Sequence, residues 1–183
     1  MRETVEMIVR KSPMHPVFFH DGPTYWIRAM SFDPNAGYRS IRSNHYKAVG
    51  TASADTRSAL TCVLNSSLFY MYFKTFSNCR DFSTGEIFAF PIGVFRSPTV
   101  GTLCLLADKL LERYRQTREV KQRHYPSGDV EYCEYYPVHS KPIIDEIDRV
   151  LARYYGFTEE ELDFIISYDI KYRMGKAGEE EEA

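Results

Sequence analysis

The sequence predicts an α+β protein, in which a β-rich N-terminal part packs with a helical C-terminal part. Short apolar runs separated by turn residues occupy the first fifty residues, a pattern typical of strands. From residue 55 onward, apolar residues recur at steps of three and four, a pattern typical of helices packed on a core. With 183 residues, of which 44% are hydrophobic, the chain is long enough for one domain with a core of its own.

We expect this domain to span residues 1–175. Its first part, 1–95, is β-rich with a helical stretch, and its second part, 96–175, is mainly helical. The last residues, 176–183, include four consecutive glutamates, and we expect them to form an acidic disordered tail.

Four stretches predict the strands. They are rich in β-branched and aromatic residues and are bounded by Pro, Gly and Asp, and they lie at 4–9, 17–19, 24–30 and 45–50.

The predicted helices begin at Asp55. We expect two helices there, separated by a Ser or Asn cap within 65–67. An amphipathic helix follows from about 100 to 116, and its basic face is expected to continue as a basic helix over 109–123.

Two further helices are predicted near the C-terminus. Ser140 is expected to cap the first, and Gly156 to end it. Thr158 and Glu161 have the spacing of a capping box for a last short helix.

Composition excludes several classes of protein. No apolar run reaches the roughly 20 residues of a membrane-spanning helix, and the first residues do not resemble a signal peptide. The cysteines and histidines lack the spacing of a zinc site or a disulfide framework, so we expect reduced thiols in a cytoplasmic protein with no metal. No glycine-rich phosphate loop or nucleophile elbow is present.

Two short motifs only partly match catalytic ones. Asp169 and Lys171 have the D-x-K form of metal-dependent nucleases, in which the carboxylate holds the metal and the lysine orients water. A helix end with a surface lysine explains them better, because three residues match easily by chance. Residues 33–36 (DPNA) partly match the loop with which amino-methyltransferases hold a flipped base, but they lack its second proline and its aromatic residue.

The net charge of −2 conceals an asymmetry. Residues 1–125 carry 17 Lys and Arg against 10 Asp and Glu, whereas residues 126–183 carry 6 against 15, so the two parts have charges of +7 and −9. Such an asymmetry indicates a face that binds a polyanion. Two stretches in the basic part, 38–47 and 70–84, combine Arg, Lys, Asn and Ser, side chains suited to phosphates and base edges.

The stretch 65–92 (NSSLFYMYFKTFSNCRDFSTGEIFAFPI) closely resembles the core signature of the TaqI-like specificity domain. That domain is the C-terminal target-recognition part of adenine-specific DNA methyltransferases and of fused type IIG restriction-modification enzymes. Residues 140–175 resemble the C-terminal end of the same enzymes, and 23–30 and 43–47 fit the β-rich stretch before the signature. The resemblance covers most of 17–175.

The resemblance implies a module that reads DNA, with no catalytic residues of its own. Methyl transfer in the family depends on an upstream domain with an S-adenosylmethionine site and an NPPY-type loop, and neither motif occurs here. We therefore expect this chain to be either the C-terminal part of a longer enzyme or a truncated gene product. Its expected partners are double-stranded DNA and the missing N-terminal methyltransferase domain. Whether that enzyme also has endonuclease activity stays open.

The candidate DNA-binding residues are the donor-rich side chains of the two polar stretches and of the basic extension. Arg42, Asn44 and Arg80 are assigned to base edges, and Lys47, Lys74, Lys121 and Arg123 to phosphates. The whole set comprises Arg39, Arg42, Ser43, Asn44, Lys47, Lys74, Asn78, Arg80, Lys121 and Arg123.

Two alternatives remain. The first is a protein-interaction module that docks on a catalytic subunit without touching DNA, and its binding would not depend on salt as phosphate contacts do. The second is a metal-dependent nuclease that uses Asp169 and Lys171.

Overall fold

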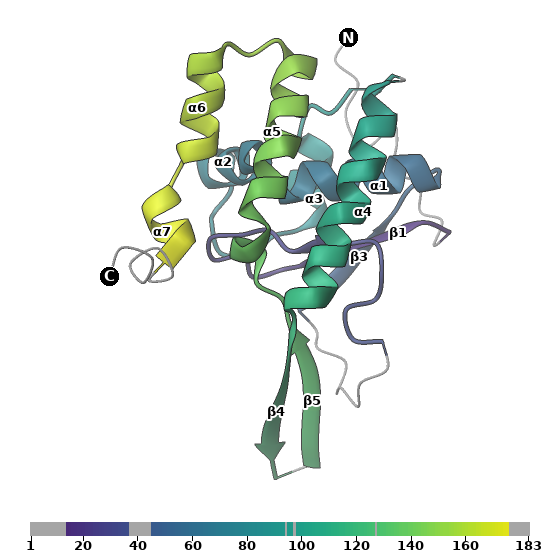
Figure 1. Ribbon diagram of the computed structural model, residues 1–183. Coiled ribbons are helices and arrows are strands. Elements are labelled where there is room, and N and C mark those ends of the chain that lie inside the picture. Colours follow the sequence, from purple (N-terminus) through teal and green to yellow (C-terminus); the bar gives the residue numbers. More distant parts are fainter. Residues whose placement is uncertain (1–13, 37–44, 94, 97, 127, 176–183) are drawn as a thin grey trace.

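The computed structural model of the chain describes residues 14–36, 45–93, 95–96, 98–126 and 128–175 (Figure 1). In this part of the chain, helices pack around a small antiparallel sheet, and a two-stranded ribbon projects away from them. The predicted α+β class is confirmed. No helix among the described residues has both the length and the apolar character needed to cross a membrane.

The sheet has three strands in the order β2-β1-β3, with β1 at Pro16–His20, β2 at Ala29–Met30 and β3 at Tyr46–Gly50. Both pairings are antiparallel, with Phe19 opposite Ala29 in one and Val17 opposite Val49 in the other. These four side chains are buried against the helices; along β1 and β3 they alternate with more exposed ones, whereas in β2 Met30 is buried as well.

The predicted strands at 17–19 and 45–50 are confirmed. The predicted strand at 24–30 is shortened to two residues, and the one predicted at 4–9 lies outside the described residues.

Helix α1, Ala54–Asn65, and helix α2, Ser67–Phe76, are separated at Ser66. The Ser66 hydroxyl accepts a hydrogen bond from the Phe69 amide, while its own amide donates to the Val63 carbonyl. One residue thus ends the first helix and caps the second, as the sequence predicts. The short helix α3, Thr84–Ala89, was not predicted, although Ser83 and Glu86 form a capping box at its start.

The C-terminal helices are α4 at Thr99–Thr117, α5 at Lys141–Tyr155, α6 at Glu159–Ser167 and α7 at Ile170–Met174. A 3-10 turn, η2 at Pro137–Ser140, leads into α5.

The predicted ends of the C-terminal helices are largely confirmed. Gly156 ends α5 in the left-handed conformation (φ 76°), and Thr158 and Glu161 form the capping box of α6. Ser140 stands at the cap position of α5, but its side chain makes no capping hydrogen bond, so this part of the prediction is wrong.

The predicted helix over 100–116 is confirmed by α4, but a β-ribbon replaces the end of the expected basic helix over 109–123. Helix α4 ends at Thr117, and β4 at Glu119–Tyr125 pairs antiparallel with β5 at Gly128–Glu134. Beyond Thr117 the helical prediction is wrong, because the hydrogen bonds and cross-strand side-chain pairs of Glu119–Tyr125 lie with β5, the next strand of the chain. Figure 1 shows the ribbon extending from the C-terminal end of α4.

A single hydrophobic core joins the two predicted parts of the domain. Phe69 of α2 packs edge-on against Phe82 and Phe90, and the same core includes Leu110 of α4 and Ile144 of α5. Helix α4 packs against both α1 and α5. The boundary at residue 95 therefore does not separate two cores.

Candidate nucleic-acid interface

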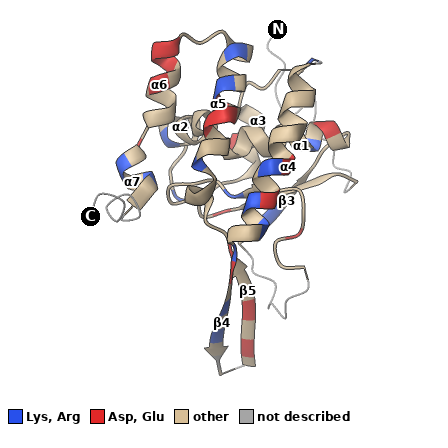
Figure 2. Ribbon diagram, viewed as in Figure 1, with Lys and Arg blue, Asp and Glu red and all other residues tan. Residues whose placement is uncertain are grey.

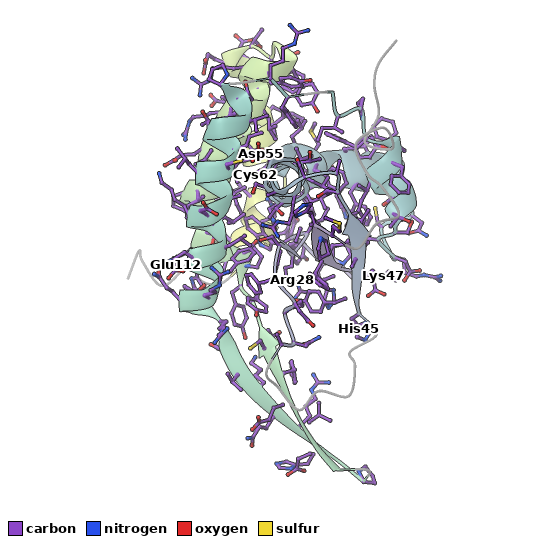
Figure 3. All side chains as sticks on the ribbon, turned by 90° about the vertical axis from the view of Figure 1, so that its right-hand side faces the viewer. Arg28, His45, Lys47, Asp55, Cys62 and Glu112 are labelled. Carbon is purple, nitrogen blue, oxygen red and sulfur yellow. The ribbon has the colours of Figure 1, made fainter. Side chains whose placement is uncertain are left out.

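The turn after β1 organises a polar surface at the end of the sheet. The Asp21 carboxylate lies 3.2 Å from Nδ1 of His45 and 3.3 Å from Nζ of Lys47. In addition, the Asp21 amide donates to the His45 carbonyl (2.8 Å). Figure 3 shows His45 and Lys47 on the same side of the molecule. Asp21 therefore orients two donor side chains at the start of β3.

The loop at 77–83 joins this surface, although it is far away in the sequence. The Phe82 amide donates to the Asp21 carbonyl at 2.7 Å, and the Phe82 ring is fully buried. Within the loop, Oδ1 of Asn78 accepts from the amides of Arg80 (2.9 Å) and Asp81 (3.2 Å). The loop is thus anchored at its end and braced from within, as expected for a loop that presents side chains to a partner.

The loop exposes one strongly basic side chain. Arg80 is 83% exposed, and its Nε lies 2.9 Å from the carboxylate of Asp81. The pair is accessible to water, so it costs little to separate, and Arg80 can reach an acceptor outside the protein.

Two residues on β1 and before β2, which the sequence pattern did not indicate, complete the surface. The His20 amide donates to the Arg28 carbonyl (3.1 Å), and the His20 ring stacks on that of His45, with centroids 5.7 Å apart. Their signal in the sequence was weak, because each lies in a short apolar strand pattern. We call the whole set the strand-end surface, made of residues 20–21, 28, 45–47 and 77–83.

The His20 ring is neutral at pH 7. Burial, helped by the positive charge of Arg28, lowers the pKa of His20 to about 4. Its Nδ1 accepts a hydrogen bond from the Gly22 amide at 3.1 Å, so the proton of the neutral ring is on Nε2. His20 thus offers a donor without a charge.

The structure brings together only some of the predicted site residues. Lys47, Asn78 and Arg80 belong to the strand-end surface. Lys74 lies half-buried in the last turn of α2, before the loop. Four predicted residues lie outside the described residues: Arg39, Arg42, Ser43 and Asn44.

Lys121 and Arg123, the predicted phosphate contacts, lie on the ribbon. Nζ of Lys121 is 2.5 Å from the Glu134 carboxylate, which raises the pKa of Lys121, and the Arg123 guanidinium lies 5.6 Å from the Tyr132 ring centroid. Figure 2 shows basic residues along β4 facing acidic residues along β5. Lys121 would have to exchange a carboxylate for a phosphate, which makes it a poorer contact than the sequence predicts.

Asp169 and Lys171 have a structural explanation. Asp169 stands at the start of α7 with φ 55°, and its carboxylate accepts a hydrogen bond from the Tyr70 hydroxyl at 3.2 Å. Lys171 is exposed on the short helix. No group of three His, Cys, Asp or Glu side chains in the described part of the chain is placed to hold a metal ion.

A buried network connects α7 to the rest of the fold. Asp148 of α5 accepts hydrogen bonds from the amides of Ser67 (3.1 Å) and Leu68 (3.2 Å) at the start of α2. Arg173 donates to the Ser67 hydroxyl (2.9 Å), and its guanidinium lies 4.0 Å from the Trp26 ring centroid. These contacts attach α7 to the start of α2 and to Trp26.

No protein-family model matches the chain, and no curated protein or solved structure matches it either. The likeness of 65–92 and 140–175 to target-recognition domains thus stays an interpretation of the sequence.

Proposed function

We propose that this chain is the DNA target-recognition part of an adenine-specific, S-adenosylmethionine-dependent DNA methyltransferase or a type IIG restriction-modification enzyme. The proposal joins the resemblance of 65–92 and 140–175 to one structural observation. The Asp21 turn contacts both donor-rich segments, through its carboxylate to Lys47 and through its carbonyl to the amide of Phe82.

The chemistry of this surface suits a nucleic acid. Its exposed side chains are mainly hydrogen-bond donors, which match phosphate oxygens and the acceptors of base edges. They stand on strand ends and on a loop braced by Asn78, so little ordering is needed when DNA binds.

The resemblance implies that catalysis and DNA recognition lie in two different domains of the enzyme. The methyltransferase domain that it implies would hold S-adenosylmethionine, whose methyl group passes to the adenine amino group. The strand-end surface would hold the duplex in register and read its bases. We place the protein in the cytoplasm, where its four free cysteines would stay reduced.

Salt-dependent binding of duplex DNA tests the proposal. We expect the full chain to bind a fluorescent duplex, with an affinity that falls steeply between 50 and 200 mM salt because phosphate contacts release counterions. Replacing Arg80→Glu should lower the affinity at low salt about tenfold or more. Fluorescence anisotropy titrations measure both effects.

The matched control is Arg153→Glu, which reverses an exposed arginine on α5, an element that contributes nothing to the strand-end surface. It should leave the affinity within about twofold of the wild type. The proposal fails if the wild-type chain does not bind duplex DNA at low salt, or if the Arg80 and Arg153 variants behave alike.

A second candidate function is docking on a catalytic subunit without DNA contact. Phe164 of α6 is 63% exposed at the edge of a surface cavity of about 320 Å³, which Met71 and Phe157 also line. Exposed apolar side chains around a cavity are typical of protein interfaces. Binding that does not change with salt would favour this candidate.

A further inference from the structure

We propose that Arg28 reads a guanine base edge and is thereby a specificity-determining residue. This inference rests on the proposed function, because it names the base that the strand-end surface recognises. Four observations support it. They are the strand register of Arg28, the hydrogen bonds of Asn65 to the neighbouring residue, the Arg28 guanidinium without an ion-pair partner among the described residues, and the neutral His20 ring beside it.

The strand register places Arg28 next to His20 on one face of the sheet. Phe18 lies opposite Met30, and the hydrogen bond from the His20 amide to the Arg28 carbonyl continues this pairing past Phe19 and Ala29. Since side chains alternate between faces, Arg28 shares the face of Met30, and His20 shares the face of Phe18. The two side chains are cross-strand neighbours, with Cβ atoms about 5 Å apart.

The backbone of Ala29, which follows Arg28, is held by a buried side chain. Nδ2 of Asn65 donates to the Ala29 carbonyl (2.8 Å), and Oδ1 accepts from the Ala29 amide (3.2 Å). Asn65 therefore acts as one more strand partner at the edge of β2, and it ties this edge to α1. A reading residue benefits from such a fixed base, because less freedom is lost on binding.

The guanidinium of Arg28 is uncommitted, unlike three of the cations that the sequence predicts to bind DNA. Lys47 pairs with Asp21, Arg80 with Asp81 and Lys121 with Glu134. Within the residues that the structure describes, no hydrogen bond or ion pair engages the Arg28 side chain, which is half-buried. The charge of Arg28 helps to lower the pKa of Glu134, but Lys121 has the larger effect and binds that carboxylate. Figure 3 shows Arg28 between α4 and the strand side of the molecule that carries Lys47.

The neighbouring donor favours guanine over the other bases. In the major groove guanine presents two acceptors, N7 and O6, and arginine binds them with two parallel hydrogen bonds. Adenine presents one acceptor beside an amino group, which an arginine fork and a further N–H donor from His20 would oppose. The charged Arg28 guanidinium and the neutral His20 N–H together favour guanine, whose major-groove edge presents two acceptors side by side.

Selection from a random duplex library tests the inference with the full chain. The wild type should select sites with guanine at one fixed position, preferred about tenfold or more over adenine. Arg28→Gln should lose the preference at that position and keep it elsewhere, and Arg28→Lys should retain part of it. Arg153→Gln serves as the matched control and should select the wild-type sites, while melting curves verify that each variant is folded.

Several results would overturn the inference. An unchanged guanine preference in Arg28→Gln, or a wild type that binds duplexes with no guanine preference, contradicts it while the proposed function stands. Uniform weakening over all sequences, with a salt slope smaller by about one, would assign Arg28 to a phosphate instead. If the wild type binds no duplex at all, the proposed function and the inference fail together.

Discussion

At the scale of single residues, buried Asp148 makes the stability of this fold sensitive to pH. Burial raises the pKa of Asp148 from 3.8 to about 6, against the opposing effect of hydrogen bonds from Ser67 and Leu68 and of the charge of Arg173. The carboxylate satisfies two amides at the start of α2 that have no partner within their own helix.

The pH dependence follows from this shift. Between pH 3.8 and about 6 the folded state keeps a proton on Asp148 that the unfolded chain has lost, so stability falls as the pH rises through this range. The loss amounts to about 3 kcal/mol. Urea unfolding of the wild type and of Asp148→Asn at several pH values measures it: the wild type should lose this stability relative to the variant between pH 4 and 6.

The titration of His20 changes the stability with pH in the opposite direction from that of Asp148. The effect of Asp148 must therefore be measured as a difference between the wild type and a variant. The pKa of His20 is lowered to about 4, and the unfolded chain is therefore protonated where the folded ring is neutral. Stability from this group rises with pH between about 4 and 6.5. The wild-type profile contains both effects, whereas Asp148→Asn removes only one. A difference between wild type and Asp148→Asn that is constant with pH would contradict the prediction.

At the scale of elements, two glycines differ in whether their backbone conformation requires glycine. Gly156 ends α5 with φ 76°, a conformation that costs most other residues about 1 kcal/mol or more. Gly101 lies inside α4, and a Cβ atom added there would meet nothing within 4 Å.

Alanine should therefore have opposite effects at these two positions. We expect Gly156→Ala to lower the free energy of unfolding by about 1 kcal/mol, and Gly101→Ala to raise it by about 0.5–1 kcal/mol. Thermal or urea unfolding measures both, and each variant is the control for the other. Equal effects of the two substitutions would show that the αL conformation of Gly156 does not determine the result.

The ribbon shows why helix prediction failed beyond residue 117. The basic residues of 109–123 suggested one continuous face, but no local signal separates Arg115 on the helix from Lys121 on the strand. Whether this segment forms a helix or a strand depends on its pairing with β5. There the Gln122 amide donates to the Glu131 carboxylate (2.6 Å), and Lys121 forms an ion pair with Glu134. Both acids come from the acidic part of the sequence. Glu134 therefore neutralises a positive charge, that of Lys121, which the charge asymmetry suggested would face DNA.

At the scale of the whole molecule, the chain brings its N-terminal and C-terminal parts together through Trp26 and Arg173. The indole N–H donates to the Arg173 carbonyl (3.0 Å), and the guanidinium stacks on the ring. Because one core and this contact join the two parts, the described domain should unfold as a single cooperative unit.

The single tryptophan makes this prediction measurable. Fluorescence of Trp26 reports the junction between the two parts, and circular dichroism at 222 nm reports the helices. We expect the two denaturation curves to coincide in midpoint and slope. If Trp26 responds before the helical signal is lost, α7 separates from the core independently and the molecule is not one unit.

The candidate site could be predicted only in part. Lys47, Asn78 and Arg80 were identified from the donor-rich composition of their segments. Arg28 and His20 were missed because a single polar residue in an apolar stretch carries no signal by itself. Lys121 was overestimated, because its partner Glu134 lies on another strand, beyond the turn of the ribbon.

The sequence by itself determined the α+β class, most helix ends and the asymmetry of charge. These depend on interactions within a few residues, such as the capping boxes at Ser83 and Thr158 and the break at Ser66. Only the tertiary structure decided the ribbon, the role of Asn65 at the edge of the sheet and the meeting of the two polar segments at Asp21. Each of these depends on pairing with a strand, helix or loop elsewhere in the chain, and a local pattern does not encode its partner.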